Sequence, residues 1–77
     1  MITILLFAHL GDQAGKSTVQ MQAAGMTAGE MKESLSETYK LKGIYTAMIA
    51  VNEEFADEST VLKDGDTVAF IPPVSGG

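Results

Sequence analysis

Residues 2–8 read ITILLFA and residues 67–71 read TVAFI, and both segments are rich in β-branched and aromatic residues. This composition favours β-strands, and the two prolines after the second segment end it because proline cannot donate a hydrogen bond to a sheet. Residues 17–22 alternate polar and apolar side chains, which predicts a second strand that pairs with the first as a hairpin. The segment 9–16 contains glycines and an aspartate, so we expect a loop or a loose helical turn there.

One helix is predicted from Thr27 onward. Thr27 and Glu30 have the three-residue spacing of a capping box, in which each side chain satisfies a free backbone N–H group. We expect Gly43 to end the helix, after Lys40 and Lys42 have placed positive charge near its carboxyl end. Four apolar residues recur at helical steps and form one stripe: Ala28, Met31, Leu35 and Tyr39.

Residues 47–51 read AMIAV, a continuous apolar run that is typical of a strand covered on both faces. Residues 55–56 predict a short edge strand, and the KDGD sequence of residues 63–66 predicts a turn into the last strand. We place Met21, Met31 and Met48 in the core. The resulting order is β-β-α-β-β-β, with one main helix on one face of a mixed sheet of four to five strands. This α+β arrangement is the β-grasp (ubiquitin-like) fold.

Length and composition narrow the function. The 77 residues form a single domain at 1–77, for which we expect a flexible tail at 72–77. The net charge of −5, without any arginine, argues against nucleic acid and anionic membranes as partners and favours a basic protein surface. Without cysteine and with one histidine, we expect no metal site and no bound cofactor. Together with the short chain, these counts also argue against a self-sufficient enzyme. No apolar run reaches the length of a membrane span, so we expect a cytoplasmic protein.

The two outer segments carry apolar residues on both faces. In each strand the alternating set that includes a threonine is expected to face solvent, which places Leu5, Phe7 and Ile71 side by side if the first and last strands pair. A contiguous exposed apolar patch on a small protein marks a partner surface. The alternative is that these three residues lie beneath the segment 9–16.

The chain ends with PPVSGG at residues 72–77. Two prolines hold the chain extended beyond the sheet, and two glycines without Cβ atoms can enter a narrow tunnel. This pattern predicts a slim probe whose terminal carboxylate is its distinctive chemical group. A frayed terminus is the alternative.

These features together resemble the small subunits of molybdopterin synthase, the MoaD-type sulfur carriers of the ubiquitin-like family. The likeness spans nearly the whole chain and includes LFA at residues 6–8, AVN at 50–52 and LKDGDTVAFIPPVSGG at 62–77. The chain departs from the family in the loop after the first strand, where Arg-Glu is common and residues 10–12 read LGD.

The resemblance implies that an E1-like enzyme uses Mg-ATP to adenylylate the carboxylate of Gly77, which then becomes a thiocarboxylate. The sulfur would pass to cyclic pyranopterin monophosphate within a heterotetramer formed with the large synthase subunit, to whose basic groups the phosphate would bind. Leu5, Phe7 and Ile71 would supply the apolar contact with a partner. The tail residues that would insert into the large subunit are Pro72, Pro73, Val74, Ser75 and Gly76.

Two other functions remain open. A sulfur carrier for thiamine thiazole or tRNA thiolation would use the same terminal chemistry with a different acceptor. A plain β-grasp interaction module would not need its terminal glycines.

Overall fold

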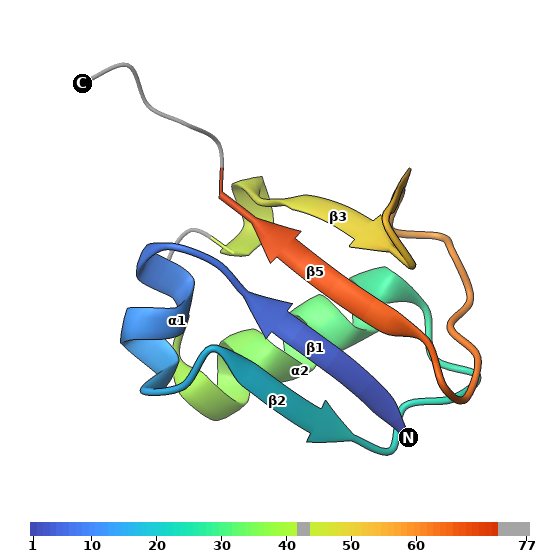
Figure 1. Ribbon diagram of the computed structural model, residues 1–77, viewed down its shortest axis with the longest axis horizontal. Helices are drawn as coiled ribbons and strands as arrows, with labels where there is room; N and C mark the ends of the chain where they lie inside the picture. The colour runs from blue at the N-terminus through green and yellow to red at the C-terminus, as the bar shows by residue number, and fades with distance from the viewer. Residues whose placement is uncertain (42–43, 73–77) are drawn as a thin grey trace.

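The structure is a computed structural model and describes residues 1–41 and 44–72. In these two ranges one sheet lies in front of one long helix (Figure 1). The strands are β1 (Ile2–Leu6), β2 (Thr18–Met21), β3 (Met48–Val51), β4 (Glu54–Ala56) and β5 (Thr67–Ile71). The helices are α1 (His9–Ala14), α2 (Ala28–Tyr39) and the short 3-10 helix η1 (Ile44–Thr46).

The strand order across the sheet is β2-β1-β5-β3-β4. The central strands β1 and β5 are parallel, and the other three neighbouring pairs are antiparallel. The first and last strands therefore pair at the middle of a mixed sheet. This topology confirms the predicted α+β, β-grasp class.

Alternation along β1 and β5 divides the sheet into two faces. Ile2, Ile4 and Leu6 of β1 are buried against α2, as are Val68 and Phe70 of β5. Their neighbours along each strand point to the other side, as the period of two residues requires. The predicted assignment of core and solvent faces is confirmed for both strands.

Helix α2 begins as predicted. The Thr27 hydroxyl accepts a hydrogen bond from the backbone N–H of Glu30 at 3.1 Å, and the Glu30 carboxylate accepts one from the backbone N–H of Thr27 at 2.9 Å. These two bonds complete the capping box. The stripe is also confirmed, since Ala28, Met31 and Leu35 are buried and Tyr39 packs at the edge of the core.

The predicted end of this helix at Gly43 is wrong. The helix stops at Tyr39, and Lys40 adopts a left-handed conformation with φ 54° and ψ 49°. Leu41 is buried in the core, although its position falls off the apolar stripe of α2. A longer helix would carry Leu41 away from the core, so the chain turns at Lys40 instead. Residues 42 and 43 lie outside the described residues.

Between β1 and β2, the segment expected to form a loop or a loose helical turn forms the six-residue helix α1. Leu10 anchors α1 because its side chain is fully buried in the core. Gly11 permits the close packing, since a Cβ atom there would lie 2.9 Å from the carbonyl oxygen of Leu6. Gly15 closes the helix in a left-handed conformation with φ 78°.

Strand β3 is not covered on both faces, contrary to the prediction from its apolar run. Met48 was expected in the core, but it lies on the face opposite α2 and is 45% exposed. Met31 is buried as predicted, and Met21 packs against the core from a half-buried position. A single helix covers a single face of the sheet, so an apolar run can still be exposed on its other side. Among the described residues, no helix combines the length and the hydropathy needed to cross a bilayer.

Candidate functional site

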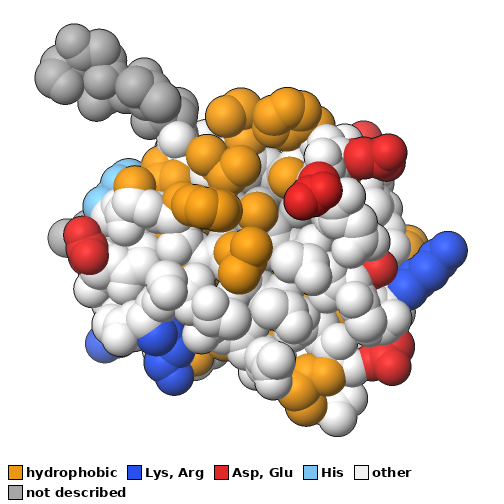
Figure 2. Space-filling view, in the orientation of Figure 1, with side chains coloured by type: hydrophobic (Ala, Val, Ile, Leu, Met, Phe, Trp, Pro, Cys, Tyr) orange, Lys and Arg blue, Asp and Glu red, His pale blue; other side chains and the backbone are white. Residues whose placement is uncertain are grey.

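The sheet face opposite α2, which we call the open face, brings Leu5, Phe7 and Ile71 together. Leu5 of β1 pairs with Ala69 of β5, and the backbone N–H of Phe7 donates to the carbonyl of Phe70 at 3.3 Å. Hydrophobic side chains gather over β1, β5 and β3 on the side that faces the viewer in Figure 2. The predicted clustering of these three residues is confirmed, while their role as a partner interface stays a prediction.

This clustering produces a shallow groove of about 590 Å³ on the open face. The surface is hollowed where the small, paired residues Ala50 and Ala69 lie between larger apolar neighbours. The residues that line it are Leu5, Phe7, Ala50, Asn52, Glu53, Phe55, Thr67, Ala69 and Ile71. A surface of this shape suits apolar side chains of another protein better than a small molecule, which needs a more enclosed site.

The segment 9–16 does not hide the open face. It forms α1, whose Leu10 turns into the core, and Phe7 remains 45% exposed. The alternative that Leu5, Phe7 and Ile71 are simply covered by this segment is therefore wrong.

Phe55 is an open-face residue that the sequence pattern did not assign to the partner surface. It lies on β4 opposite Ala50 and is 76% exposed, more than Phe7 or Met48. The sequence predicted a short edge strand at this position. The pairing register of that strand with β3 then puts Phe55 on the same face as Ala50. That register depends on the turn between β3 and β4, which the sequence pattern alone does not specify.

A polar network borders the open face at the end where β3 turns into β4. The side chain of Asn52 donates to Oδ1 of Asp66 at 2.9 Å and accepts from the backbone N–H of Thr67 at 3.0 Å. Oδ2 of Asp66 accepts from the backbone N–H of Lys63 at 2.8 Å. These bonds to Lys63 and Asn52 lower the pKa of Asp66 because they stabilise its ionised form.

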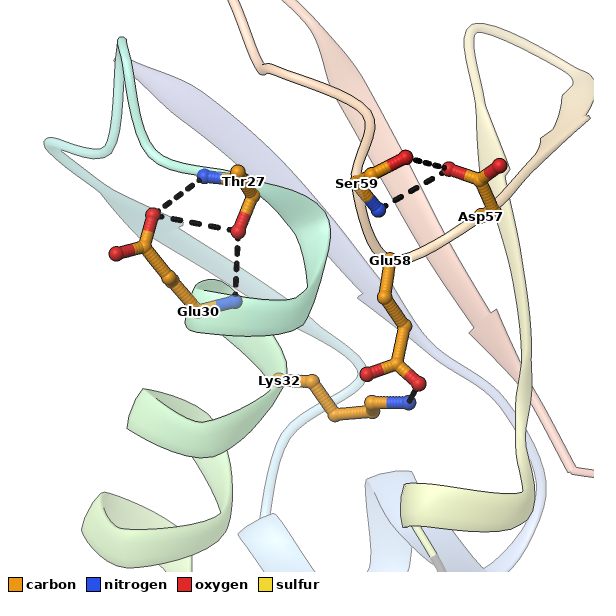
Figure 3. A network of polar contacts seen from close by, with 6 residues as sticks. All are labelled: Thr27, Glu30, Lys32, Asp57, Glu58 and Ser59. Atoms are coloured by element: carbon orange, nitrogen blue, oxygen red, sulfur yellow. Dashed lines mark hydrogen bonds and ion pairs between the residues drawn. The ribbon is translucent and has the colours of Figure 1, made fainter.

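A second polar network links the segment after β4 to α2 (Figure 3). Nζ of Lys32 lies 3.0 Å from Oε2 of Glu58, although the Lys32 side chain is 4% exposed and that of Glu58 is 65% exposed. The same ammonium lies 5.7 Å from the centre of the Tyr45 ring. Hydrogen bonds from the Ser59 hydroxyl and backbone lower the pKa of the neighbouring Asp57. The network ties this segment to α2, which is a structural role.

Acidic side chains lie near this end of the molecule, including Glu53 in the groove itself. Within residues 1–41 and 44–72, however, no three His, Cys, Asp or Glu side chains are grouped closely enough to hold a metal ion. His9, at the start of α1, is exposed. The charged groups of the described residues thus border the open face without forming a metal-binding cluster.

The predicted tail is only partly described. Pro72 follows β5 directly and is buried. Pro73, Val74, Ser75, Gly76 and Gly77 lie outside the described residues, so their predicted insertion and chemistry remain predictions. The described chain does show that the tail follows Ile71, a residue that lines the open-face groove.

Comparisons with known proteins bear on these features. The family model described as the ThiS family matches residues 4–77. A molybdopterin synthase sulfur carrier subunit of Mycobacterium tuberculosis is 40% identical over 68 residues, covering 86% of this chain and 81% of that protein.

Solved structures agree with the fold. SAMP1 from Haloferax volcanii matches with a TM-score of 0.83 at 26% identity, covering 99% of this chain and 98% of that chain. A complex of subunits 1 and 2 of molybdopterin-converting factor from Helicobacter pylori matches with a TM-score of 0.72 at 26% identity, covering 99% of this chain and 97% of that chain. The resemblance drawn from the sequence is confirmed, and since the family model spans nearly every residue, the chain belongs to the ThiS family.

Proposed function

We propose that this protein is a sulfur carrier of molybdenum cofactor biosynthesis and acts as the small subunit of molybdopterin synthase. The support is the agreement between its family, the sulfur carrier subunit to which it is 40% identical, and an apolar open face that borders the start of the tail. The observation that carries the proposal is this position of the groove: Ile71 lines it, and the last six residues follow Ile71 directly. A partner that covers the open face would hold the tail at its own surface.

The chemistry belongs to Gly77. A carboxylate is a poor electrophile, so an E1-like enzyme first adenylylates it with Mg-ATP, which creates a good leaving group. Sulfur from a donor then displaces AMP and leaves a thiocarboxylate. Its sulfur is the nucleophile that attacks cyclic pyranopterin monophosphate in the large subunit. Hydrolysis of the resulting acyl–sulfur bond then leaves the sulfur on the acceptor and returns the carboxylate of Gly77. This chain thus serves as the sulfur donor and contributes no independent catalytic site.

The open face serves as the docking surface in this proposal. The apolar side chains of Leu5, Phe7 and Ile71 provide the buried centre that an interface requires. The acidic surplus of the chain favours a basic rim on the partner and speeds association. The proposed assembly is a heterotetramer in which a dimer of large subunits carries one small subunit at each end.

The test is the intact mass of the protein after incubation with the adenylating enzyme, Mg-ATP and a sulfur source. We expect the mass gain that corresponds to the exchange of one oxygen for sulfur, and its absence after deletion of Gly77. Two matched measurements complete the test: both forms should unfold at the same temperature and bind the large subunit. An unchanged mass of the intact protein would contradict the sulfur-carrier function.

The acceptor is tested separately. The loaded protein, mixed with the large subunit and cyclic pyranopterin monophosphate, should lose its sulfur and yield molybdopterin. Sulfur loading without binding to the large subunit would indicate the carrier of thiamine thiazole or tRNA thiolation instead. Normal function after deletion of Gly77 would indicate a plain interaction module.

A further inference from the structure

The turn between β3 and β4 has an unusual backbone. Asn52 and Glu53 form a two-residue connection between the paired residues Val51 and Glu54, with φ 52° and 70°. Positive φ at both positions is the requirement of a type I′ hairpin turn, for which Asn-Gly is the preferred sequence. Asparagine adopts this conformation readily, but glutamate does not. The turn therefore depends on contacts beyond its own two residues.

Those contacts join the turn to the start of β5. The backbone N–H of Asn52 donates to the carbonyl of Thr67 at 2.8 Å. The Asn52 side chain adds its bond from the Thr67 N–H and its bond to the Asp66 carboxylate. We call these three hydrogen bonds the hairpin clamp. Asp66 is itself held, because its side chain accepts from Lys63 and its carbonyl accepts from the Thr3 N–H at 3.0 Å.

The clamp matters because it anchors the turn end of β4, whereas the other end is held by Ala56, which packs against the core, and by the Lys32–Glu58 pair in the segment that follows. Strand β4 is three residues long and lies at the edge of the sheet, and within the described residues β3 is its one partner strand. Yet the hairpin supplies Ala50, Glu53 and Phe55 to the groove on the open face. The 76% exposed side chain of Phe55 gains little from packing, so the backbone of the hairpin sets its position. A loose hairpin would leave one wall of the groove without a defined position.

We propose that Asn52 is a positioning residue for partner binding: through Asp66 and Thr67 it holds the β3–β4 hairpin against β5 and so presets one wall of the docking groove. This inference rests on the proposed docking function, because it assigns to Asn52 the pre-organisation of that same surface. A preset wall improves affinity by removing the cost of ordering it when the partner binds.

The hydrogen-bond donors and acceptors of the clamp can be tested by swapping the side chains of Asn52 and Asp66. In Asn52→Asp two carboxylates face each other, and one hydrogen bond is replaced by repulsion. In Asp66→Asn the new amide cannot accept from both Asn52 and the Lys63 N–H, so one bond is lost. The double substitution restores all the bonds, since the new carboxylate at position 52 accepts from Thr67 and from the new amide at position 66. That amide then accepts from Lys63 through its oxygen.

Binding to the large subunit of molybdopterin synthase from the same organism is the first readout. We expect Asn52→Asp to weaken affinity about tenfold, and the double substitution to return it to within about threefold of the wild type. Thr27→Ala is the matched control, because it removes the capping box of α2 and lowers stability at a site away from the open face. We expect it to change affinity less than about twofold.

Hydrogen exchange of the isolated protein is the second readout and needs no partner. The amides of Glu54 and Ala56, which face β3, should exchange about tenfold faster in Asn52→Asp, recover in the double substitution and remain unchanged in Thr27→Ala. Unchanged exchange in Asn52→Asp would overturn the inference whether or not the protein carries sulfur. If Asn52→Asp bound the large subunit as tightly as the wild type does, the inference would also be overturned. The proposed function would then still stand. Failure of the wild type to acquire sulfur would refute only the proposed function, because the exchange measurement still decides the role of Asn52.

Discussion

The two faces of the sheet each carry a phenylalanine, and the two side chains differ in their burial. Phe70 of β5 points toward α2 and is fully buried, whereas Phe7, one residue beyond β1, is 45% exposed on the open face. The two residues are joined by a backbone hydrogen bond from Phe7 to Phe70, so they are neighbours in space. The difference comes from strand alternation, which sends adjacent side chains to opposite faces.

This difference predicts that stability and the proposed binding are carried by separate sets of residues in one small domain. The covered face holds the buried side chains that stabilise the fold, and the open face holds apolar side chains that, in the proposed function, become buried when the partner binds. Substitutions on the covered face should therefore lower mainly the unfolding free energy, and substitutions on the open face should lower mainly the affinity for the partner.

The largest effect is expected at Phe70. Phe70→Ala removes a fully buried ring from the covered face and leaves a cavity, which costs about 3–5 kcal/mol of unfolding free energy. Urea unfolding followed by circular dichroism measures this loss. A destabilisation below about 1 kcal/mol would show that the covered face is not the main source of stability.

Phe7→Ala is the matching change on the open face. We expect the unfolding free energy to fall by less than about 1 kcal/mol, because the ring is already partly in water. Affinity for the large subunit should fall at least about tenfold, since a buried aromatic anchor is lost from the interface. Titration calorimetry and urea unfolding of the same samples measure both quantities. Unchanged affinity would remove Phe7 from the docking surface.

A smaller effect is expected from Glu58→Gln on the covered side. The substitution leaves the buried ammonium of Lys32 without its ionised partner, which should cost about 1–3 kcal/mol. Glu33→Gln is the control, because it removes the same charge from an exposed position on α2. Thermal unfolding should separate the two variants, and equal melting temperatures would show that the Lys32 ion pair adds no stability.

The smallest effect is expected in the dependence of the melting temperature on acidic pH. Hydrogen bonds lower the pKa of Asp57 and of Asp66 in the folded protein, so each ionised carboxylate favours folding. This contribution is present above the unfolded pKa of about 3.9 and is lost as pH falls through the lower folded value. The melting temperature of the wild type should therefore drop between about pH 4 and pH 2. In Asp57→Asn the drop should be shallower, and an equally steep drop would exclude Asp57 as a contributor.

Much of this organisation was predictable because it depends on neighbours in the sequence. The capping box of Thr27 and Glu30, the apolar stripe of α2 and the alternation of β1 and β5 all follow from spacings of two to four residues. The clustering of Leu5, Phe7 and Ile71 needed one further assumption, the pairing of the first and last strands, which the topology supports.

Other features depended on contacts between distant segments. Met48 is exposed because no second helix in the described residues covers the open face, and α2 ends at Tyr39 because Leu41 packs into the core. The Asn52–Asp66 contact spans 14 residues, and the Lys32–Glu58 pair joins a helix to a loop. Local spacing sets which side of an element is apolar, but it contains no information on which distant element will lie against that side. Only the packed chain decides this, because burial is a property of all the segments that meet at one place.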